Sequence, residues 1–251
     1  MPGVEGRVAL VTGGGRGIGR RTADILAERG ASVMCVARSK QELEATGHSY
    51  IVADLGTADG CADAVTAARD QMGPIDILVC NHGLGSAHER VLWEQDLKDW
   101  KDAIRINLDG PFYLSRLVMR EMVDRRYGRL VFTSSTAALS PEHAGSAYNS
   151  SKAGLLGLMK SVAVDGGAYG ITANAVLPGW VRTEMAERSA RFEAEERGID
   201  SSQVWEERAA LYRAGRVATT DEVANMIAFL AAEESSGVSG ESIRVALGGM
   251  D

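Results

Sequence analysis

The sequence predicts an α/β fold in which a seven-stranded parallel sheet is covered by helices on both faces. Short runs of apolar, β-rich residues alternate with amphipathic helical patterns from the start of the chain to its end. This alternation is typical of βαβ units, whose strands form a buried parallel sheet. Because no repeat, low-complexity tract or linker divides the pattern, residues 1–251 are expected to form a single domain.

The individual elements follow from hydrophobic periodicity and from turn signals. Strands are predicted at residues 8–12, 33–37, 49–53, 75–80, 129–134, 172–177 and 242–246, and helices at 18–29, 60–72, 100–126, 147–167 and 221–232. Thr220 is the expected N-cap of the last helix. Two segments fall outside this alternation: a polar connection at 84–99 and a long insertion at 183–215.

The insertion is predicted to form two short helices, each with one apolar stripe. The stripes are Met185, Ser189 and Phe192, then Trp205, Ala209 and Tyr212, each set at spacing i, i+4, i+7. The charged residues between positions 187 and 197 are expected to form a solvated helix face.

The composition is that of an ordinary globular protein. Of the 251 residues, 45% are hydrophobic and 24% are charged, so the chain can bury a sizeable core. The formal net charge of −7 argues against a nucleic-acid or anionic-membrane partner, because either needs a concentrated positive patch. No apolar stretch is long enough to span a bilayer and the first residues lack a signal-peptide pattern, so a cytoplasmic location is expected.

Three cysteines, Cys35, Cys61 and Cys80, show neither CxxC spacing nor an even number. They are expected to be buried, unreactive thiols, and no metal site is predicted.

A glycine-rich turn, TGGGRGIG at residues 12–19, follows the first predicted strand and opens the first predicted helix. Glycine permits a tight turn and a close approach of the backbone to phosphate, while free N–H groups and the helix dipole attract the anion. The turn is therefore predicted to hold the pyrophosphate of a dinucleotide rather than to be merely flexible.

The glycine spacing differs from the GxGxxG of the general dinucleotide fold. It resembles the TGxxxGxG of the short-chain dehydrogenase/reductase family. Further motifs follow in the order of that family: CNHG at 80–83 in place of NNAG, Asn107, Ser135, YNSSK at 148–152 for YxxxK, and PGWVRT at 178–183 for PGxVxT. The sequence departs from the family at Cys80 and His82. The resemblance covers essentially the whole chain and implies a doubly wound Rossmann fold.

The resemblance implies that Asn107, Ser135, Tyr148 and Lys152 form a catalytic tetrad. Oxidising an alcohol requires a base for the hydroxyl proton as hydride leaves for nicotinamide, and reducing a ketone requires the same group as an acid. Tyr148 is expected to fill both roles.

Bringing the pKa of the phenol from near 10 to about 7 needs about 4 kcal/mol of phenolate stabilisation. Lys152, one helical turn later, and the charge of oxidised nicotinamide are expected to supply it. Ser135 is expected to orient the substrate and stabilise developing charge, and Asn107 to hold a water chain. Each residue alone could be an ordinary surface or buried polar group, so the prediction depends on their joint spacing.

NADP(H) is the expected cofactor, with NAD(H) as the alternative. Where NAD-specific sites place an acidic residue after the second strand, this chain has Ala37 followed by Arg38. Arginine binds a 2′-phosphate with paired donors, and Arg16 resembles a basic residue that NADP-preferring members of the family often carry. Residues expected to contact the cofactor are Gly13, Gly15, Arg16, Gly17, Ile18, Gly19, Arg38, Asp54, Leu55, Asn81, Gly83, Tyr148, Lys152, Pro178, Gly179, Val181 and Thr183.

The substrate is expected beneath residues 183–215 and beside residues 139–147, because the resemblance places the nicotinamide at Val181 and Thr183. The candidate contacts are His143, Trp180, Met185 and Trp205, together with Leu139, Phe192 and Tyr212. Apolar stripes of this kind more often pack against their own protein.

The expected reaction interconverts a secondary alcohol and a ketone. The alternatives are a 3-oxoacyl-thioester reductase acting on acyl-carrier-protein or CoA substrates, an NAD-dependent sugar or hydroxy-acid dehydrogenase, and a non-catalytic dinucleotide-binding scaffold. Arg129 could help dock an acidic carrier protein, but Tyr169 stands before Gly170, where carrier-dependent reductases often have a basic residue. A scaffold would typically lose the tyrosine or the lysine, and both are present.

The resemblance also implies a homotetramer or homodimer that associates through its long helices. In the strand order of the family one strand separates Cys35 from Cys80, at about 9.5 Å, which excludes a disulfide between them.

Overall fold

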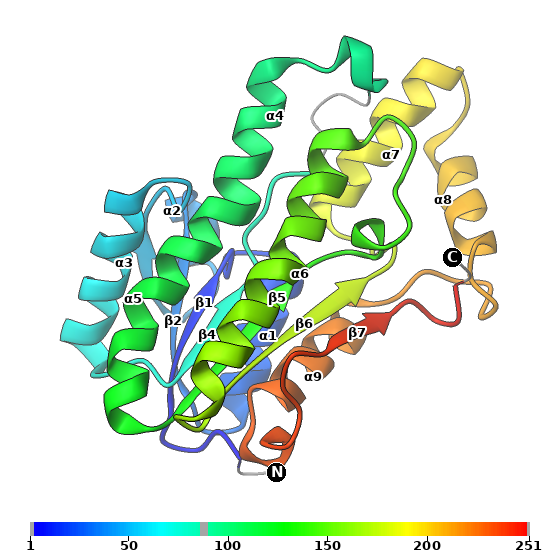
Figure 1. The fold of residues 1–251 in the computed structure, drawn as a ribbon. Coiled ribbons are helices and arrows are strands. Elements are labelled where there is room, and N and C mark those ends of the chain that lie inside the picture. The colour runs from blue at the N-terminus through cyan, green and yellow to red at the C-terminus, as the bar shows by residue number, and fades with distance from the viewer. Residues whose placement is uncertain (1–2, 86–89, 250–251) are drawn as a thin grey trace.

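The computed structural model describes residues 3–85 and 90–249 and has an α/β fold built on one parallel sheet (Figure 1). Its strands are β1 (Val8–Thr12), β2 (Ser32–Ala37), β3 (Ser49–Val52), β4 (Ile77–Cys80), β5 (Gly128–Thr133), β6 (Ile171–Pro178) and β7 (Ser242–Val245), in the order β3-β2-β1-β4-β5-β6-β7. The order reverses between β1 and β4, and such a switch point is where open α/β sheets bind ligands.

Helices cover both faces of the sheet. Figure 1 shows α3 (Ala58–Met72), α5 (Gly110–Arg125) and α6 (Ser146–Gly167) on one face, with α1 (Gly17–Glu28) and α9 (Thr220–Leu230) on the other. The remaining helices are α2 (Lys40–Glu44), α4 (Leu97–Ile104), α7 (Glu184–Arg197) and α8 (Ser201–Ala210), with 3-10 turns η1 (Leu92–Glu94), η3 (Thr136–Ala138) and η4 (Glu233–Ser235). Within the described residues no helix is long and apolar enough to cross a membrane.

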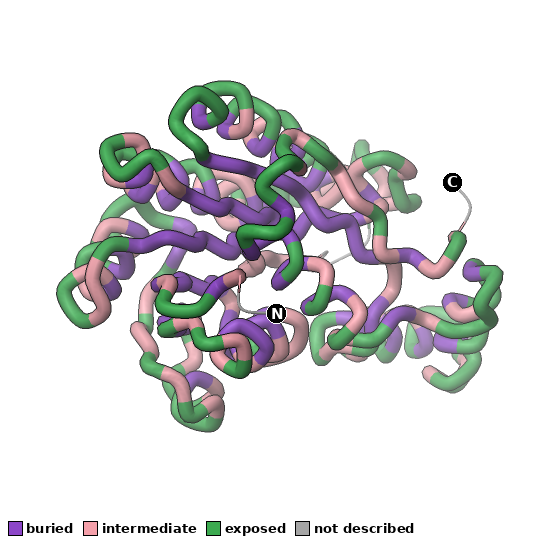
Figure 2. Tube along the Cα trace, turned by 90° about the horizontal axis from the view of Figure 1, so that it is seen from below, coloured by how far each residue is buried: buried purple, intermediate pink, exposed green. Residues whose placement is uncertain are grey.

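The strands form the centre of the hydrophobic core (Figure 2). Every residue of β1, β4, β5 and β6 is buried, which explains why these strands are apolar throughout rather than alternating. Two large clusters of buried side chains lie on the two faces of the sheet, and a third, smaller one lies between α7 and α8.

The seven predicted strands and the predicted fold class are confirmed, and the two short helices of the insertion are present. Four details were wrong or missed. The N-cap of α9 is Thr219 and not Thr220. The helix predicted at 100–126 is divided by a π-helical turn, η2 (Arg105–Asp109). The buried stripe of α7 consists of Ala186, Ala190 and Ala194. Helix α2 was not predicted.

The cysteines are free and buried, as predicted, and β1 lies between the strands of Cys35 and Cys80. Burial raises the pKa of Cys35 and of Cys61 to about 12, so both are protonated thiols at neutral pH.

Candidate active site

The glycine turn lies between β1 and the N-terminus of α1, and its backbone requires glycine at two positions. Gly13 and Gly17 have φ angles of 64° and 54°, a region that side-chain-bearing residues rarely adopt. At Gly19 an added Cβ would lie only 2.3 Å from the carbonyl oxygen of Gly13. The turn is thus a close-packed cradle of backbone groups at a helix N-terminus, which fits a pyrophosphate.

Thr12, the last residue of β1, joins this turn to the segment after β4. Its hydroxyl donates to the carbonyl of Val79 at 3.0 Å and accepts from the backbone N–H of Asn81 at 2.9 Å. The Nδ1 atom of His82 also lies 2.8 Å from this hydroxyl. Asn81 returns a bond from its side-chain amide to the carbonyl of Thr12 at 3.2 Å. The two predicted cofactor segments are therefore fixed to each other across the switch point.

His82 stands where the family has alanine and faces the protein interior rather than solvent. Burial lowers the pKa of its imidazole to about 4, so the ring is neutral at physiological pH. The contact with Thr12 gives this departure from the family motif a structural role.

Asn107 is fully buried in the π-helical turn η2, which aims its amide at two neighbouring segments. Its oxygen accepts from the N–H of Leu84 at 2.7 Å, and its nitrogen donates to the carbonyl of Leu84 at 2.9 Å and to Ser151 Oγ at 3.0 Å. A π-helical turn at a functional residue is a recurrent arrangement. Asn107 thereby connects the strand-end segment to α6.

Lys152 lies on α6 with 5% of its surface exposed. Its ammonium donates to the carbonyl of Thr133, at the end of β5, over 2.9 Å and lies 5.7 Å from the centre of the Tyr148 ring. An added Cβ at Gly83 would lie 3.4 Å from this nitrogen, so a glycine there leaves room beside it. Burial lowers the pKa of Lys152 to about 8.

Tyr148 and Ser135 approach each other from α6 and from the end of β5. A hydrogen bond with Ser135 favours the phenolate, but removal of the phenol from water is the larger effect and raises the pKa of Tyr148 to about 12. The expected lowering by Lys152 and oxidised nicotinamide together stays a prediction, since the protein chain alone raises the pKa. Lys152 is directed at the Thr133 carbonyl and its charge does not offset the loss of water around the phenol.

The residues predicted at the adenosine end occupy different environments. Arg38 is exposed directly after β2. Arg16 pairs with Glu42 of α2 at 3.2 Å and with Glu184 of α7. The Asp54 carboxylate accepts hydrogen bonds from the N–H of Gly56 at 3.0 Å and from Arg105 at 3.1 Å. These two bonds hold the pKa of Asp54 below its usual value. Leu55, the next residue, is buried.

The segment after β6 closes toward the glycine turn. Val181 pairs with Ala218 in an isolated β-bridge, and Thr183 caps α7 by accepting from the N–H of Ala186 at 3.3 Å. The methyl group of Thr183 lies 3.5 Å from where a Cβ of Gly17 would be. Residues 178–183 and the turn at 12–19 thus lie next to each other.

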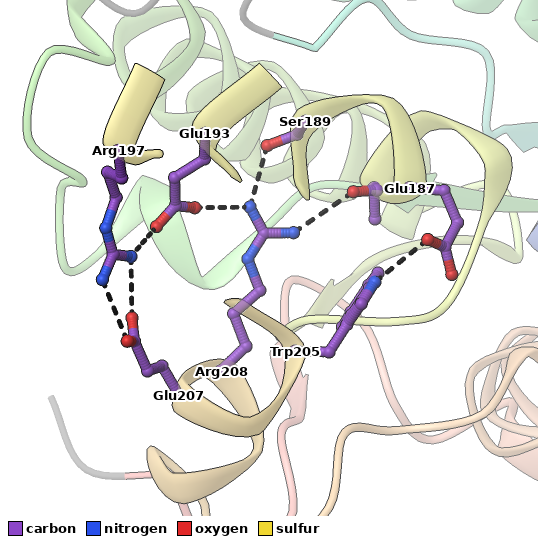
Figure 3. Close-up of polar contacts among 8 residues, drawn as sticks. Glu187, Ser189, Glu193, Arg197, Trp205, Glu207 and Arg208 are labelled. Carbon is purple, nitrogen blue, oxygen red and sulfur yellow. Dashed lines mark hydrogen bonds and ion pairs between the residues drawn. The ribbon is translucent and has the colours of Figure 1, made fainter. Parts of the chain in front are cut away.

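Of the four main predicted substrate contacts, His143 lines a cavity, Met185 is partly exposed, and Trp180 and Trp205 pack against other parts of the protein. His143 lines a cavity of about 370 Å³ together with Arg90, Val91, Glu94, Ala144, Phe192 and Glu196. Met185 is partly exposed and lies against Gly85. Trp205 is buried between α7 and α8, where its indole N–H donates to Glu187 at 3.0 Å (Figure 3). Trp180 stacks against Arg208.

Sequence reasoning missed three supporting residues, Thr12, Ser151 and Arg208. Thr12 belongs to the glycine-rich turn and Ser151 to the YNSSK motif, so these motifs could have indicated both residues. Arg208 was not identifiable, because nothing in its local sequence distinguishes a buried arginine from those on the solvated face.

The fold and this site define an α/β oxidoreductase that uses a nicotinamide dinucleotide. The sequence pattern of the short chain dehydrogenase family matches residues 7–194, and the chain belongs to that family. It is an enzyme that interconverts CH–OH and carbonyl groups with NAD or NADP.

Relatives of known activity are similar over almost the whole chain. The 3-oxoacyl-acyl-carrier-protein reductase FabG of Escherichia coli K12 is 36% identical over 248 residues, covering 96% of both chains. An actinorhodin polyketide ketoreductase variant solved with NADPH has a TM-score of 0.92 at 29% identity, covering 96% of each chain. A xylitol dehydrogenase solved with NAD⁺ has a TM-score of 0.90 at 27% identity, covering 98% of this chain and 99% of the other.

Proposed function

We propose that the enzyme interconverts a secondary alcohol and a ketone by hydride transfer with NADP(H), using Tyr148 as acid and base. The observation that carries the proposal is the convergence of Tyr148, Ser135, Lys152 and Asn107 at the carboxyl ends of β4 and β5, beside the glycine turn. Three separate stretches of sequence supply these four side chains, so their meeting depends on the fold.

The residues present fit a dinucleotide. The turn at 12–19 would hold the pyrophosphate, residues 178–183 the nicotinamide end, and Lys152 the adjoining ribose. When bound, the nicotinamide supplies or accepts the hydride.

The chain's own residues handle the proton. Ser135 is hydrogen-bonded to Tyr148, and a hydroxyl can donate to a carbonyl oxygen or accept from an alcohol, so it orients the reacting oxygen toward the phenol. With its pKa lowered to about 8, Lys152 is still mostly an ammonium at neutral pH and favours the phenolate. Asn107 holds Leu84 against α6 and keeps the site assembled.

The preference for NADP(H) is supported by charge. β2 ends at Ala37 and the exposed Arg38 follows it, where a ribose-binding carboxylate would mark an NAD enzyme. A guanidinium at that place attracts the additional phosphate of NADP. Arg16 contributes less to this attraction, because Glu42 and Glu184 partly neutralise it.

A second candidate, reduction of 3-oxoacyl thioesters, is favoured by the 36% identity to the E. coli reductase. Docking of an acidic carrier protein through Arg129 is not supported, because this side chain is 2% exposed and is bound to Glu233 and to the carbonyls of Gly128 and Gly170. A CoA thioester would not need such docking. Following cofactor oxidation with small ketones, sugar-derived ketones and 3-oxoacyl-CoA separates the candidates.

Replacing Tyr148 with phenylalanine tests the proposed chemistry. Tyr148→Phe removes the proton donor and keeps the ring, so turnover should fall by about 10²-fold or more while NADPH affinity changes little. Steady-state kinetics and NADPH fluorescence measure the two quantities. Tyr169→Phe, at the C-terminal end of α6 and remote from the site, is the control and should behave as wild type. Retained turnover in Tyr148→Phe would overturn the mechanism.

A further inference from the structure

Arg208 is a buried cation in α8, with 5% of the residue exposed. Its guanidinium spans the space between α8 and α7, where it donates to the carbonyl of Ala186 at 3.2 Å, to Ser189 Oγ at 3.0 Å and to Glu193 Oε2 at 3.0 Å (Figure 3). The three acceptors lie along one side of α7, so a single side chain fixes α7 to α8.

The same guanidinium reaches the segment after β6. Its central carbon lies 3.6 Å from the ring centre of Trp180, a close cation–π stack, and 5.1 Å from the ring centre of Trp205. The backbone N–H of Trp180 donates to the hydroxyl of Tyr212, just beyond α8, at 2.6 Å. Trp180 is therefore held at its side chain and at its backbone by residues at the C-terminal end of α8.

An arginine at this place needs a reason beyond packing. Removing a cation from water is costly unless its donors are satisfied, and the opposite charge comes from Glu193, which is itself partly exposed. A leucine or methionine would fill the space between two indoles without that cost. Arginine is distinctive because its planar fork donates several hydrogen bonds while its face stacks on an aromatic ring.

We infer that Arg208 is a positioning residue for the nicotinamide end of the cofactor, acting through Trp180 on residues 181–183. This inference rests on the proposed function, which places the nicotinamide at Val181 and Thr183. Trp180 directly precedes this segment, and Ala186, Ser189 and Glu193 belong to the helix that Thr183 caps. Arg208 thus fixes both ends of the stretch that the nicotinamide contacts.

The test compares two ligands that share their adenosine and pyrophosphate. 2′-Phospho-ADP-ribose lacks the nicotinamide, whereas the reduced dinucleotide NADPH carries it, so positioning of residues 181–183 affects only the second. In Arg208→Lys and in Trp180→Leu, the dissociation constant of the reduced dinucleotide should rise about three- to tenfold, comparable to the loss of one hydrogen bond. The dissociation constant of 2′-phospho-ADP-ribose should stay unchanged. Titration calorimetry measures both constants, with thermal unfolding recorded for each variant.

Two matched variants complete the design. Arg197→Gln removes an exposed guanidinium that also joins α7 to α8, through Glu193 and Glu207, but does not contact Trp180, so both constants should remain those of wild type. Trp180→Phe keeps a ring face for Arg208 and should retain most of the dinucleotide affinity.

If the ratio of the two dissociation constants in Arg208→Lys and Trp180→Leu equals that of wild type, the inference is overturned and the proposed function is not affected. An equal loss for both ligands would also overturn it, since that result indicates general destabilisation. Wild-type protein that binds neither ligand would overturn the proposed function as well.

Discussion

The Tyr148 phenol is surrounded by protein that favours its neutral form. Its pKa is raised to about 12, and the lysine that should oppose this shift has its own pKa lowered to about 8 by the same burial. Both groups are thus destabilised in their charged forms. A ligand bearing positive charge beside the phenol would favour the phenolate, as the proposed role of oxidised nicotinamide requires.

At this scale the sequence predicted which residues meet but not their charge states. The YxxxK spacing identifies Tyr148 and Lys152 because α6 places them on one face. The direction of the pKa shift depends on how much protein surrounds the phenol, and that protein comes from segments distant in the sequence. The pairing of Arg16 with Glu42 and Glu184 could not be predicted either, because these partners come from segments distant in the sequence.

Arg38 provides a prediction about the cofactor. Arg38→Leu removes the exposed guanidinium proposed to bind the 2′-phosphate, and the loss of a charge-assisted contact should lower kcat/KM for NADPH by roughly tenfold or more. The value for NADH should change little. Arg20→Leu is the control, because Arg20 is also exposed but donates to the carbonyl of Ala45 on α2. Wild-type protein with a clear preference for NADH would contradict the assignment.

The elements of the fold follow closely from hydrophobic periodicity, and the errors lie where periodicity carries no information. The pattern of residues 100–126 predicts one uninterrupted helix, so the π-helical turn that carries Asn107, with its contacts to Leu84 and Ser151, could not be predicted. On α7 the large residues suggested the wrong stripe, because the helix packs through three alanines that permit close approach to α8.

The assignment of Thr219 as the N-cap of α9 can be tested by mutation. Thr219 and Glu222 form a capping box, in which the Thr219 hydroxyl accepts from the Glu222 N–H at 3.2 Å and the Glu222 carboxylate accepts from the Thr219 N–H at 2.9 Å. Thr219→Ala should reduce the free energy of unfolding by about 1 kcal/mol. Thr220→Ala, one residue later and inside the helix, should change it by less than about 0.5 kcal/mol. Urea denaturation measures both, and equal effects would contradict the assigned cap.

For the whole molecule, the order of strands determines which motifs can cooperate. The reversal between β1 and β4 places the glycine turn next to Asn81 and His82, and β5 follows directly with Ser135 at its end. This arrangement could be predicted from the motifs and their order. The contact of Arg208 with Trp180, and the burial of Arg129 against Glu233, arise from packing between distant segments and required the structure.

The face formed by α4, α5 and α6 carries the final prediction, that the protein is a homo-oligomer associating through these helices. Large apolar side chains are exposed on each of them: Trp100 at 37%, Phe112 at 47% and Val164 at 81%. Figure 1 shows α4 and α5 following each other end to end, with α6 alongside them. Because exposed large apolar side chains are a feature of interaction surfaces, a second copy of the chain is expected against these helices.

Val164→Glu should weaken this association at least about tenfold, because assembly would bury an unpaired carboxylate at the interface. Light scattering should give a mass well above the 26.7 kDa of one chain for wild type and a mass closer to that value for the variant. Val52→Glu, at a residue of β3 that is 48% exposed, introduces the same charge at the edge of the sheet and should leave the mass unchanged. A monomeric wild-type protein at micromolar concentration would contradict the prediction, and an unchanged mass in Val164→Glu would exclude this face as the interface.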